Sequence, residues 1–136
     1  MTATTAIPTT TARDGFLRFA MRLDALLSGV AGIGNAAFAA QIADMSGTTS
    51  ATEYAMGAFF VVYGVAVFLL SMLPSVRKAG IGVIVANLLY AVGSVVAVLS
   101  DAVPLTTAGI VLTLATGGYT LVMADLQYLG LRRMRS

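Results

Sequence analysis

The chain contains no cysteine, no histidine and no tryptophan, and only 10% of its 136 residues are charged. Without cysteine there is no disulfide and no thiolate chemistry, and without cysteine or histidine the usual ligands of zinc, copper and haem are missing. The seven methionines are scattered, which is typical of packing rather than of a copper site. We therefore expect no cofactor and no metal site. Soluble domains carry about 25% charged residues, so the composition also argues against a soluble protein.

The sequence also lacks the patterns by which enzymes and nucleic-acid-binding proteins are usually identified. It has no nucleophile beside a base, no phosphate-binding glycine loop and no metal-ligand spacing. Gly29, Gly32 and Gly34 lie inside an apolar segment, so they are not a dinucleotide fingerprint. The net charge of +2 is too small for a nucleic-acid partner, and the basic residues cluster at segment ends. We expect a non-enzymatic protein with no catalytic residues and no nucleic-acid partner.

Long apolar segments are what the chain does have. Hydrophobic residues make up 58% of the sequence and are concentrated in four segments. About 20 helical residues cross the ~30 Å hydrocarbon core of a bilayer, and a lipid-embedded segment of this kind must be helical to satisfy its backbone. The sequence predicts an all-α fold, a bundle of four transmembrane helices within residues 15–133, preceded by a flexible Thr/Ala-rich tail, residues 1–14. The expected spans are about 16–42, 54–73, 79–99 and 105–131.

The basic residues indicate how such a bundle is oriented. With four spans, all eight lie on one side of the membrane, together with both termini. The opposite side carries Asp44, Glu53 and Asp101 and no basic residue. The positive-inside rule then predicts cytoplasmic termini in the inner (plasma) membrane of a bacterium. The eight residues are Arg13, Arg18, Arg22, Arg77, Lys78, Arg132, Arg133 and Arg135.

Two acidic residues fall at the predicted cytoplasmic edge of the bundle. Counting about 20 residues inward from Asp44 places Asp24 at the first core position of the first helix. The same count from Leu105 places Asp125 just past the core of the last helix. Such carboxylates often relay protons or cations, but basic residues are plentiful at this edge, so we favour ion pairs that anchor helix ends. The expected inner-edge charge cluster is Arg18, Arg22, Asp24, Asp125 and Arg132.

A second set of polar residues lies near the middle of the predicted spans. Amide and hydroxyl groups facing lipid cost free energy, so these side chains should point into a closed bundle. Valine and leucine of the second and third helices should then face lipid. The layer is either a small-ligand pocket or, as we favour, a set of interhelical hydrogen bonds worth roughly 0.6 kcal/mol each. Its members are Asn35, Tyr63, Asn87, Tyr90 and Thr116.

Small residues recur at four-residue spacing, for example at Ala25 and Gly29, and at Ser28, Gly32 and Ala36. This spacing allows two helices to approach closely. The contact formed is either between helices of one protomer or between protomers. We favour packing within the protomer, because the four helices must first pack with each other.

Four stretches together resemble a group of small bacterial four-helix integral membrane proteins that generally carry no assigned activity. The resemblance covers about residues 16–133, implies a bacterial inner-membrane protein and transfers no catalytic residue. The stretches are Arg22-Leu23-Asp24-Ala25, Tyr63-Gly64, Asn87-Leu88-Leu89-Tyr90-Ala91 with Ser94, and Leu126-Gln127-Tyr128-Leu129-Gly130-Leu131-Arg132-Arg133.

Two functions follow from these patterns. The favoured one is an accessory or assembling subunit whose partners are the lipid bilayer and either further copies of itself or another membrane subunit. The alternative is a small proton- or cation-coupled transporter that uses Asp24. Four-helix drug exporters are similar in size, but they depend on an acid deep in the first helix, whereas the count above places Asp24 at the edge.

Overall fold

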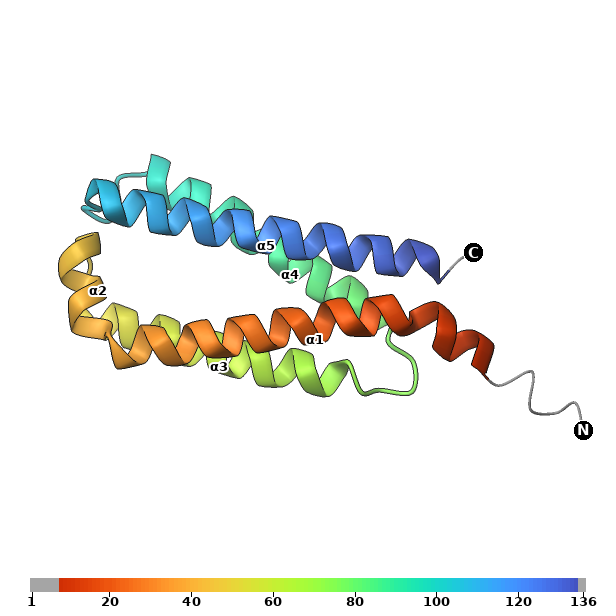
Figure 1. The fold of residues 1–136 in the computed structure, drawn as a ribbon. Coiled ribbons are helices and arrows are strands. Elements are labelled where there is room, and N and C mark those ends of the chain that lie inside the picture. Colours follow the sequence, from red (N-terminus) through yellow and green to blue (C-terminus); the bar gives the residue numbers. More distant parts are fainter. Residues whose placement is uncertain (1–7, 135–136) are drawn as a thin grey trace, which may run out of the picture.

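The computed structural model describes residues 8–134, with side chains from residue 13 onward, and this part of the chain is helical without strands (Figure 1). Residues 8–14 of the expected tail form the beginning of the first helix, and residues 1–7 lie outside the described part. The helices are α1 (Pro8–Ala37), α2 (Ala39–Ser46), α3 (Ser50–Leu70), α4 (Arg77–Leu99) and α5 (Thr107–Arg133).

Three of these helices, α3, α4 and α5, are long and apolar enough to cross a membrane. Helices α1 and α2 meet the same criteria only when taken together as a bent pair. The all-α class is therefore confirmed, and the helices indicate a multi-pass membrane protein. Within residues 8–134 there are three candidate spans, or four if the bent pair forms one of them.

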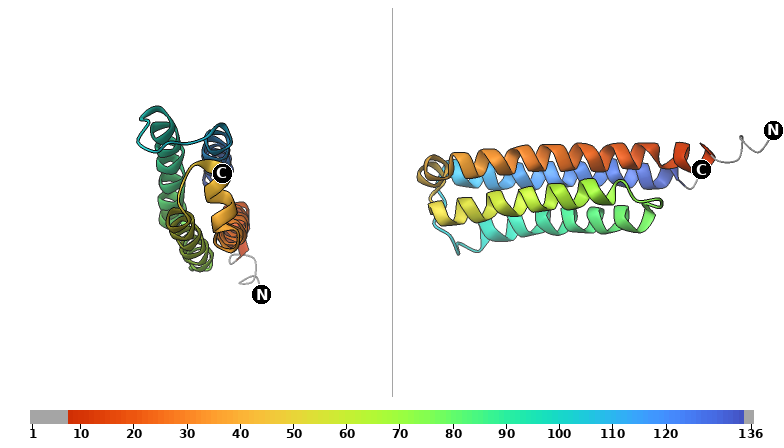
Figure 2. Two further views of the ribbon diagram at one scale, coloured as in Figure 1. Left: turned by 90° about the vertical axis from the view of Figure 1, so that its left-hand side faces the viewer. Right: turned by 90° about the horizontal axis from the view of Figure 1, so that it is seen from below.

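The first apolar segment, expected as one helix over residues 16–42, is broken at Phe38. Helix α1 ends at Ala37, and α2 continues at an angle of 86° to it. No proline lies at the break. The Asn35 amide donates a hydrogen bond to the backbone carbonyl of Glu53 at 2.8 Å, which ties the end of α1 to α3. Beyond the break α2 packs against α3 and α5 and lies across one end of the molecule (Figure 2).

The four long helices form two antiparallel pairs. Helix α1 lies along α3, α4 lies along α5, and the two pairs meet through α1 and α5 (Figures 1 and 2). The α1–α3 contact is close because glycines face the other backbone: a Cβ on Gly64 would lie 2.7 Å from the carbonyl oxygen of Ala25. A Cβ on Gly32 would lie 2.6 Å from the carbonyl oxygen of Gly57. These small residues therefore pack helices within one protomer.

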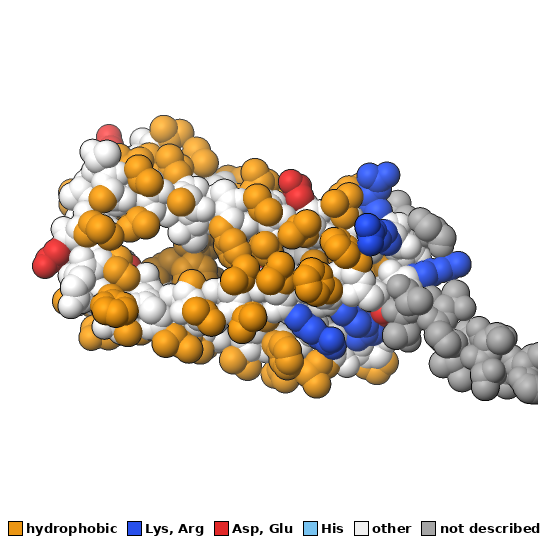
Figure 3. Space-filling model, viewed as in Figure 1, with side chains coloured by type: hydrophobic (Ala, Val, Ile, Leu, Met, Phe, Trp, Pro, Cys, Tyr) orange, Lys and Arg blue, Asp and Glu red, His pale blue; other side chains and the backbone are white. Residues whose placement is uncertain are grey.

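The two ends of the molecule differ in charge and in construction. The beginning of α1, the end of α5 and the described basic side chains lie at one end, which we call the basic end (Figures 1 and 3). The opposite end, the α2 end, is formed by α2 and the turn between α4 and α5. There Gly47 ends α2 with a φ of 82°, a left-handed conformation that favours glycine. Thr106 donates its hydroxyl to the carbonyl of Met45 at 2.5 Å, so α5 begins against α2.

Apolar packing is concentrated at the basic end. Leu17 and Met21 of α1 are fully buried against residues of the other three long helices. Many valine and leucine side chains of α3 and α4 are instead exposed, as expected for a lipid-facing surface; Val62 is 67% exposed and Leu89 66%. Beyond the apolar cluster, one turn further along α1 than Met21, the interior becomes polar.

Candidate functional site

The polar interior is centred on Asp24, whose side chain is fully buried. Its Oδ2 accepts hydrogen bonds from the hydroxyl of Tyr63 at 2.7 Å, the amide of Asn87 at 2.9 Å and the amide of Gln127 at 3.0 Å. These three donors come from α3, α4 and α5. The Asn87 amide also donates to Oε1 of Gln127 at 3.0 Å, which links the donors to each other.

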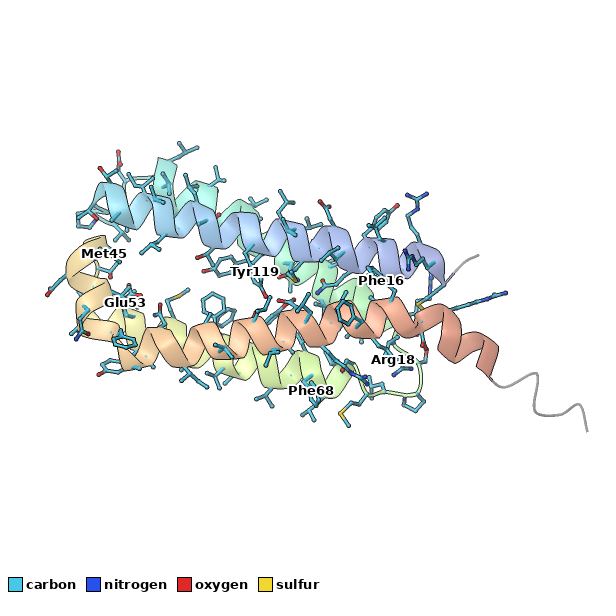
Figure 4. All side chains as sticks on the ribbon, in the orientation of Figure 1. Phe16, Arg18, Met45, Glu53, Phe68 and Tyr119 are labelled. Atoms are coloured by element: carbon cyan, nitrogen blue, oxygen red, sulfur yellow. The ribbon has the colours of Figure 1, made fainter. Side chains whose placement is uncertain are left out.

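The second carboxylate oxygen of Asp24 is occupied as well. Its Oδ1 accepts from the hydroxyl of Tyr119 at 2.7 Å and from the hydroxyl of Ser28, one turn along α1, at 3.1 Å. Figure 4 shows Tyr119 reaching from α5 toward α1. The carboxylate thus accepts five hydrogen bonds, and its donors belong to α1, α3, α4 and α5. We call this set, Asp24 with its five donors, the Asp24 cluster.

All five donors in the Asp24 cluster are neutral. The interpretation of Asp24 as an ion-pair partner of Arg18, Arg22 or Arg132 is therefore corrected by the structure. Among the described side chains the one ion pair joins Arg18 to Asp14, at 3.0 Å. A buried carboxylate without a cationic neighbour is expensive in an apolar medium, so its hydrogen bonds must compensate for lost hydration.

Asp24 also lies deeper than the count along the sequence placed it. That count began at Asp44, but α1 already ends at Ala37 and α2 turns away. Measured along the straight helix, Asp24 lies about 20 Å from Ala37 and about 9 Å inward from Arg18. Its partner Asn87 lies about 15 Å from the start of α4 at Arg77, near the middle of that helix. The carboxylate is therefore inside the bundle rather than at its edge.

The two arginines of α1 instead hold the end of α3. Arg18 donates to the carbonyl oxygens of Ser71, Leu73 and Pro74 at 2.9, 2.7 and 3.1 Å (Figure 4). Arg22 donates to the hydroxyl of Ser71 at 3.1 Å. Cations at a helix C-terminus stabilise it by satisfying free carbonyl groups and opposing the helix dipole. Arg18 and Arg22 therefore do hold a helix end, but through backbone carbonyls and the Ser71 hydroxyl rather than through Asp24.

The remaining members of the expected inner-edge charge cluster do not join Asp24. Asp125 is exposed on α5, and no hydrogen bond or ion pair to it is formed by the described residues. Arg132 is also exposed, and its guanidinium lies 5.9 Å from the ring centroid of Tyr128. The structure therefore separates the two carboxylates that the sequence pattern grouped.

The expected mid-membrane polar layer is divided in the structure. Tyr63 and Asn87 belong to the Asp24 cluster, whereas Asn35 donates to Glu53 near the α2 end. Thr116 donates to the carbonyl of Leu112 in its own helix. Tyr90 packs its ring 5.6 Å from that of Phe60, centroid to centroid. The expected layer is thus two polar centres rather than one, and neither Tyr90 nor Thr116 forms a hydrogen bond in either of them.

A small cavity adjoins the Asp24 cluster. Its volume of about 50 Å³ exceeds the roughly 10–15 Å³ that one water molecule needs on this measure. It extends from three of the donors to Asp24 toward Phe59 and Tyr90, which lie nearer the α2 end. Figure 3 shows that the surface is hollowed between the two helix pairs near α2. The lining residues are Ser28, Phe59, Phe60, Tyr63, Ala86, Asn87, Tyr90 and Thr120.

Glu53 is a second buried carboxylate, 8% exposed, near the α2 end (Figure 4). The Asn35 amide donates to its Oε1 at 3.0 Å, and the hydroxyl of Thr48 donates to its Oε2. As at Asp24, its hydrogen-bond donors among the described residues are neutral. The cavity therefore lies in the region between two buried carboxyl groups that form no ion pair with a described side chain, Asp24 and Glu53.

Sequence reasoning missed Tyr119 and Gln127 as members of the site. They are separated from Asp24 by 95 and 103 residues, so no local pattern connects them to it. The available signal was weaker: Tyr119, Met123 and Gln127 follow each other at four-residue spacing, so they share a side of α5. Polar groups along one side of an apolar helix indicate an inward face.

The chemistry of the Asp24 cluster suits a proton or a monovalent cation. A hydroxyl can donate or accept a hydrogen bond, so Ser28, Tyr63 and Tyr119 can reorient when the carboxyl gains a proton. The carboxylate, hydroxyl and amide oxygens are also the ligand type that hard cations prefer. Within residues 8–134 no group of three or more Asp, Glu, His or Cys side chains could hold a metal ion.

Comparison of the chain with protein-family models, with curated proteins and with solved structures found no match.

Proposed function

We propose that the protein is a small proton- or cation-coupled carrier of the bacterial inner membrane, with Asp24 as its ion-binding residue. One observation supports this most directly: a fully buried carboxylate is held by neutral donors from four helices and forms no ion pair with any described side chain. A carboxylate that only anchored helices would gain more from an arginine partner. A buried carboxylate without a cationic partner is suited to bind and release a positive ion.

The construction around Asp24 is what ion coupling requires. The carboxylate joins the α1–α3 pair to the α4–α5 pair, so its charge state affects how the pairs fit together. Adding a proton or cation changes which neighbours donate and which accept, at the contact between the two pairs. The adjoining cavity and Glu53 provide polar groups toward the α2 end. No covalent chemistry is proposed for the site.

The proposal is tested by the infrared spectrum of the purified protein in lipid vesicles as the pH is lowered. Asp24 should give the band of a protonated carboxyl group that is absent from Asp24→Asn and retained in Asp125→Asn. If a monovalent cation is the ligand, Na⁺ or K⁺ should reduce the band at constant pH. Changing the pH on one side of the vesicles at a time should show access from both faces, which a carrier needs and a fixed structural acid does not.

Two results would contradict the proposal. One is an Asp24 that keeps a single ionisation state throughout the pH range in which the protein stays folded. The other is access from one face only. Either would favour the accessory or assembling subunit, in which the Asp24 cluster holds the helices together and the function lies in a partner.

The carrier needs a defined orientation, and we propose four spans with both termini in the cytoplasm. The described basic side chains gather at the end where α1 begins and α5 ends, which fits the positive-inside rule (Figure 3). Reporter domains fused after Ser136 and inserted within residues 47–52 should give opposite signals, cytoplasmic for the first and periplasmic for the second. Equal signals would exclude four spans.

A further inference from the structure

An apolar groove runs along the outer seam between α1 and α3, on a different surface from the Asp24 cluster. Its volume is about 540 Å³. Its walls are exposed apolar side chains; Leu26, Val30 and Ile33 of α1 are 60–64% exposed. Figure 4 shows Phe68, which lines the groove from α3, on the side of α3 away from α5. The seam is open because Gly29 has no side chain, and a Cβ placed there would meet no atom within 4 Å.

One charged residue, Arg22, lines the groove, toward the basic end. Its Nε and Nη2 atoms point to Ser71, at 3.1 and 3.4 Å, and no carboxylate pairs with it among the described residues. The guanidinium carries five N–H donors, so it can bind a further acceptor. A positive charge at the mouth of an apolar groove is complementary to an amphipathic anion.

The length of the groove fits one leaflet of a bilayer. From Arg22 to Ile33 the groove follows α1 for about 16 Å. Half of a ~30 Å hydrocarbon core is about 15 Å. An acyl chain that begins at the level of Arg22 would therefore end near Ile33, close to the middle of the membrane.

We propose that this groove binds a phospholipid with an anionic head group from the leaflet at the basic end. Its phosphate contacts Arg22 and one acyl chain lies along the α1–α3 seam. A second copy of the protein is a poorer occupant, because a two-fold interface places the same surface on both sides and would bring Arg22 against its own copy. The inference does not depend on the function proposed for Asp24.

The absence of tryptophan from the chain allows a direct test with a single fluorescent reporter. Val30→Trp places the reporter in the groove, and Val122→Trp places it on α5, where the valine is 53% exposed outside the groove. Each variant is reconstituted in vesicles of phosphatidylcholine and phosphatidylglycerol, with bromine, which quenches tryptophan, on the acyl chains of one lipid or the other.

Brominated phosphatidylglycerol should quench the Val30→Trp reporter preferentially, with an apparent selectivity of about fivefold, as expected for one arginine near an anionic head group. Adding Arg22→Gln should remove the selectivity there and leave the Val122→Trp reporter unchanged. Adding Gly29→Leu, which fills the groove while keeping Arg22, should also remove it. Phe68→Trp, an aromatic exchange in the same groove, serves as a second reporter if Val30→Trp blocks the chain.

Three outcomes would overturn the proposal. Equal quenching by both lipids in the groove would show an ordinary lipid contact. Selectivity that survives Arg22→Gln would place the head group elsewhere. Protection of the groove reporters from both lipids would show that protein covers the seam, which would make a second copy or another subunit the occupant.

Discussion

Replacing Asp24 with leucine is expected to leave little folded protein after detergent extraction. The amides of Asn87 and Gln127 are almost completely buried and both donate to Asp24 Oδ2. Each buried donor that loses its acceptor costs about 1–3 kcal/mol, so the free energy of unfolding should fall by about 2–6 kcal/mol. Size-exclusion chromatography and thermal unfolding of the purified protein in detergent measure this loss.

Asp125→Leu is the matched control for that substitution. Both changes remove one carboxylate from a long helix, and Asp125 lies about 3 Å along α5 from Gln127, which contacts Asp24. Asp125 is exposed and bonded to no described side chain, so its replacement should leave stability unchanged or raise it, because a charge facing lipid is unfavourable. Equal destabilisation by the two substitutions would show that a general loss of charge, rather than the Asp24 cluster, determines stability.

Asp24→Asn separates the structural role of this residue from ion binding. Asparagine has nearly the same shape, and the hydroxyls around it can reverse their hydrogen bonds to suit an amide. The fold should therefore survive better than in Asp24→Leu, while the pH-dependent carboxyl band disappears. A protein that is lost equally with both substitutions would show that the negative charge itself is needed for folding.

The sequence allowed the helical segments to be predicted well because they depend on composition and length. The apolar segments at 54–73, 79–99 and 105–131 correspond to α3, α4 and α5 with shifts of two to four residues at most of their ends. The bend at Phe38 was not predictable in the same way. The apolar run continues through it, and the contact that holds the end of α1 joins Asn35 to Glu53, 18 residues away.

The error at Asp24 follows from that missed bend. Depth was counted along a helix that continued to residue 42, whereas α1 ends at Ala37, so Asp24 was placed too close to the edge. Arginines are abundant at the edge, which made ion pairing the natural interpretation. Asn87 and Tyr63 were predicted to face the interior, and they do, because polar side chains in an apolar span have few alternatives. Their shared partner required the tertiary structure.

A single methyl group at Gly64 should disturb both the helix packing and the Asp24 cluster. The Cβ of an alanine there would lie 2.7 Å from the carbonyl oxygen of Ala25 and 3.1 Å from the nitrogen of Gly29. Both atoms belong to the α1 backbone and cannot rotate away, so α1 and α3 must separate. Overpacking of this kind costs about 1–3 kcal/mol. We expect Gly64→Ala to lower the unfolding temperature in detergent.

Gly118→Ala on α5 should have the opposite sign. A Cβ at Gly118 would meet no atom within 4 Å, so alanine adds only its higher helix propensity, worth up to about 1 kcal/mol relative to glycine. The comparison therefore holds the chemical change constant and varies only the space around it. Gly64 also follows Tyr63, whose hydroxyl lies 2.7 Å from Asp24, so separating α1 from α3 should weaken that hydrogen bond. If Gly64→Ala were as stable as Gly118→Ala, α1 and α3 would not pack as closely as the structure shows, and the Tyr63–Asp24 contact would lose its support.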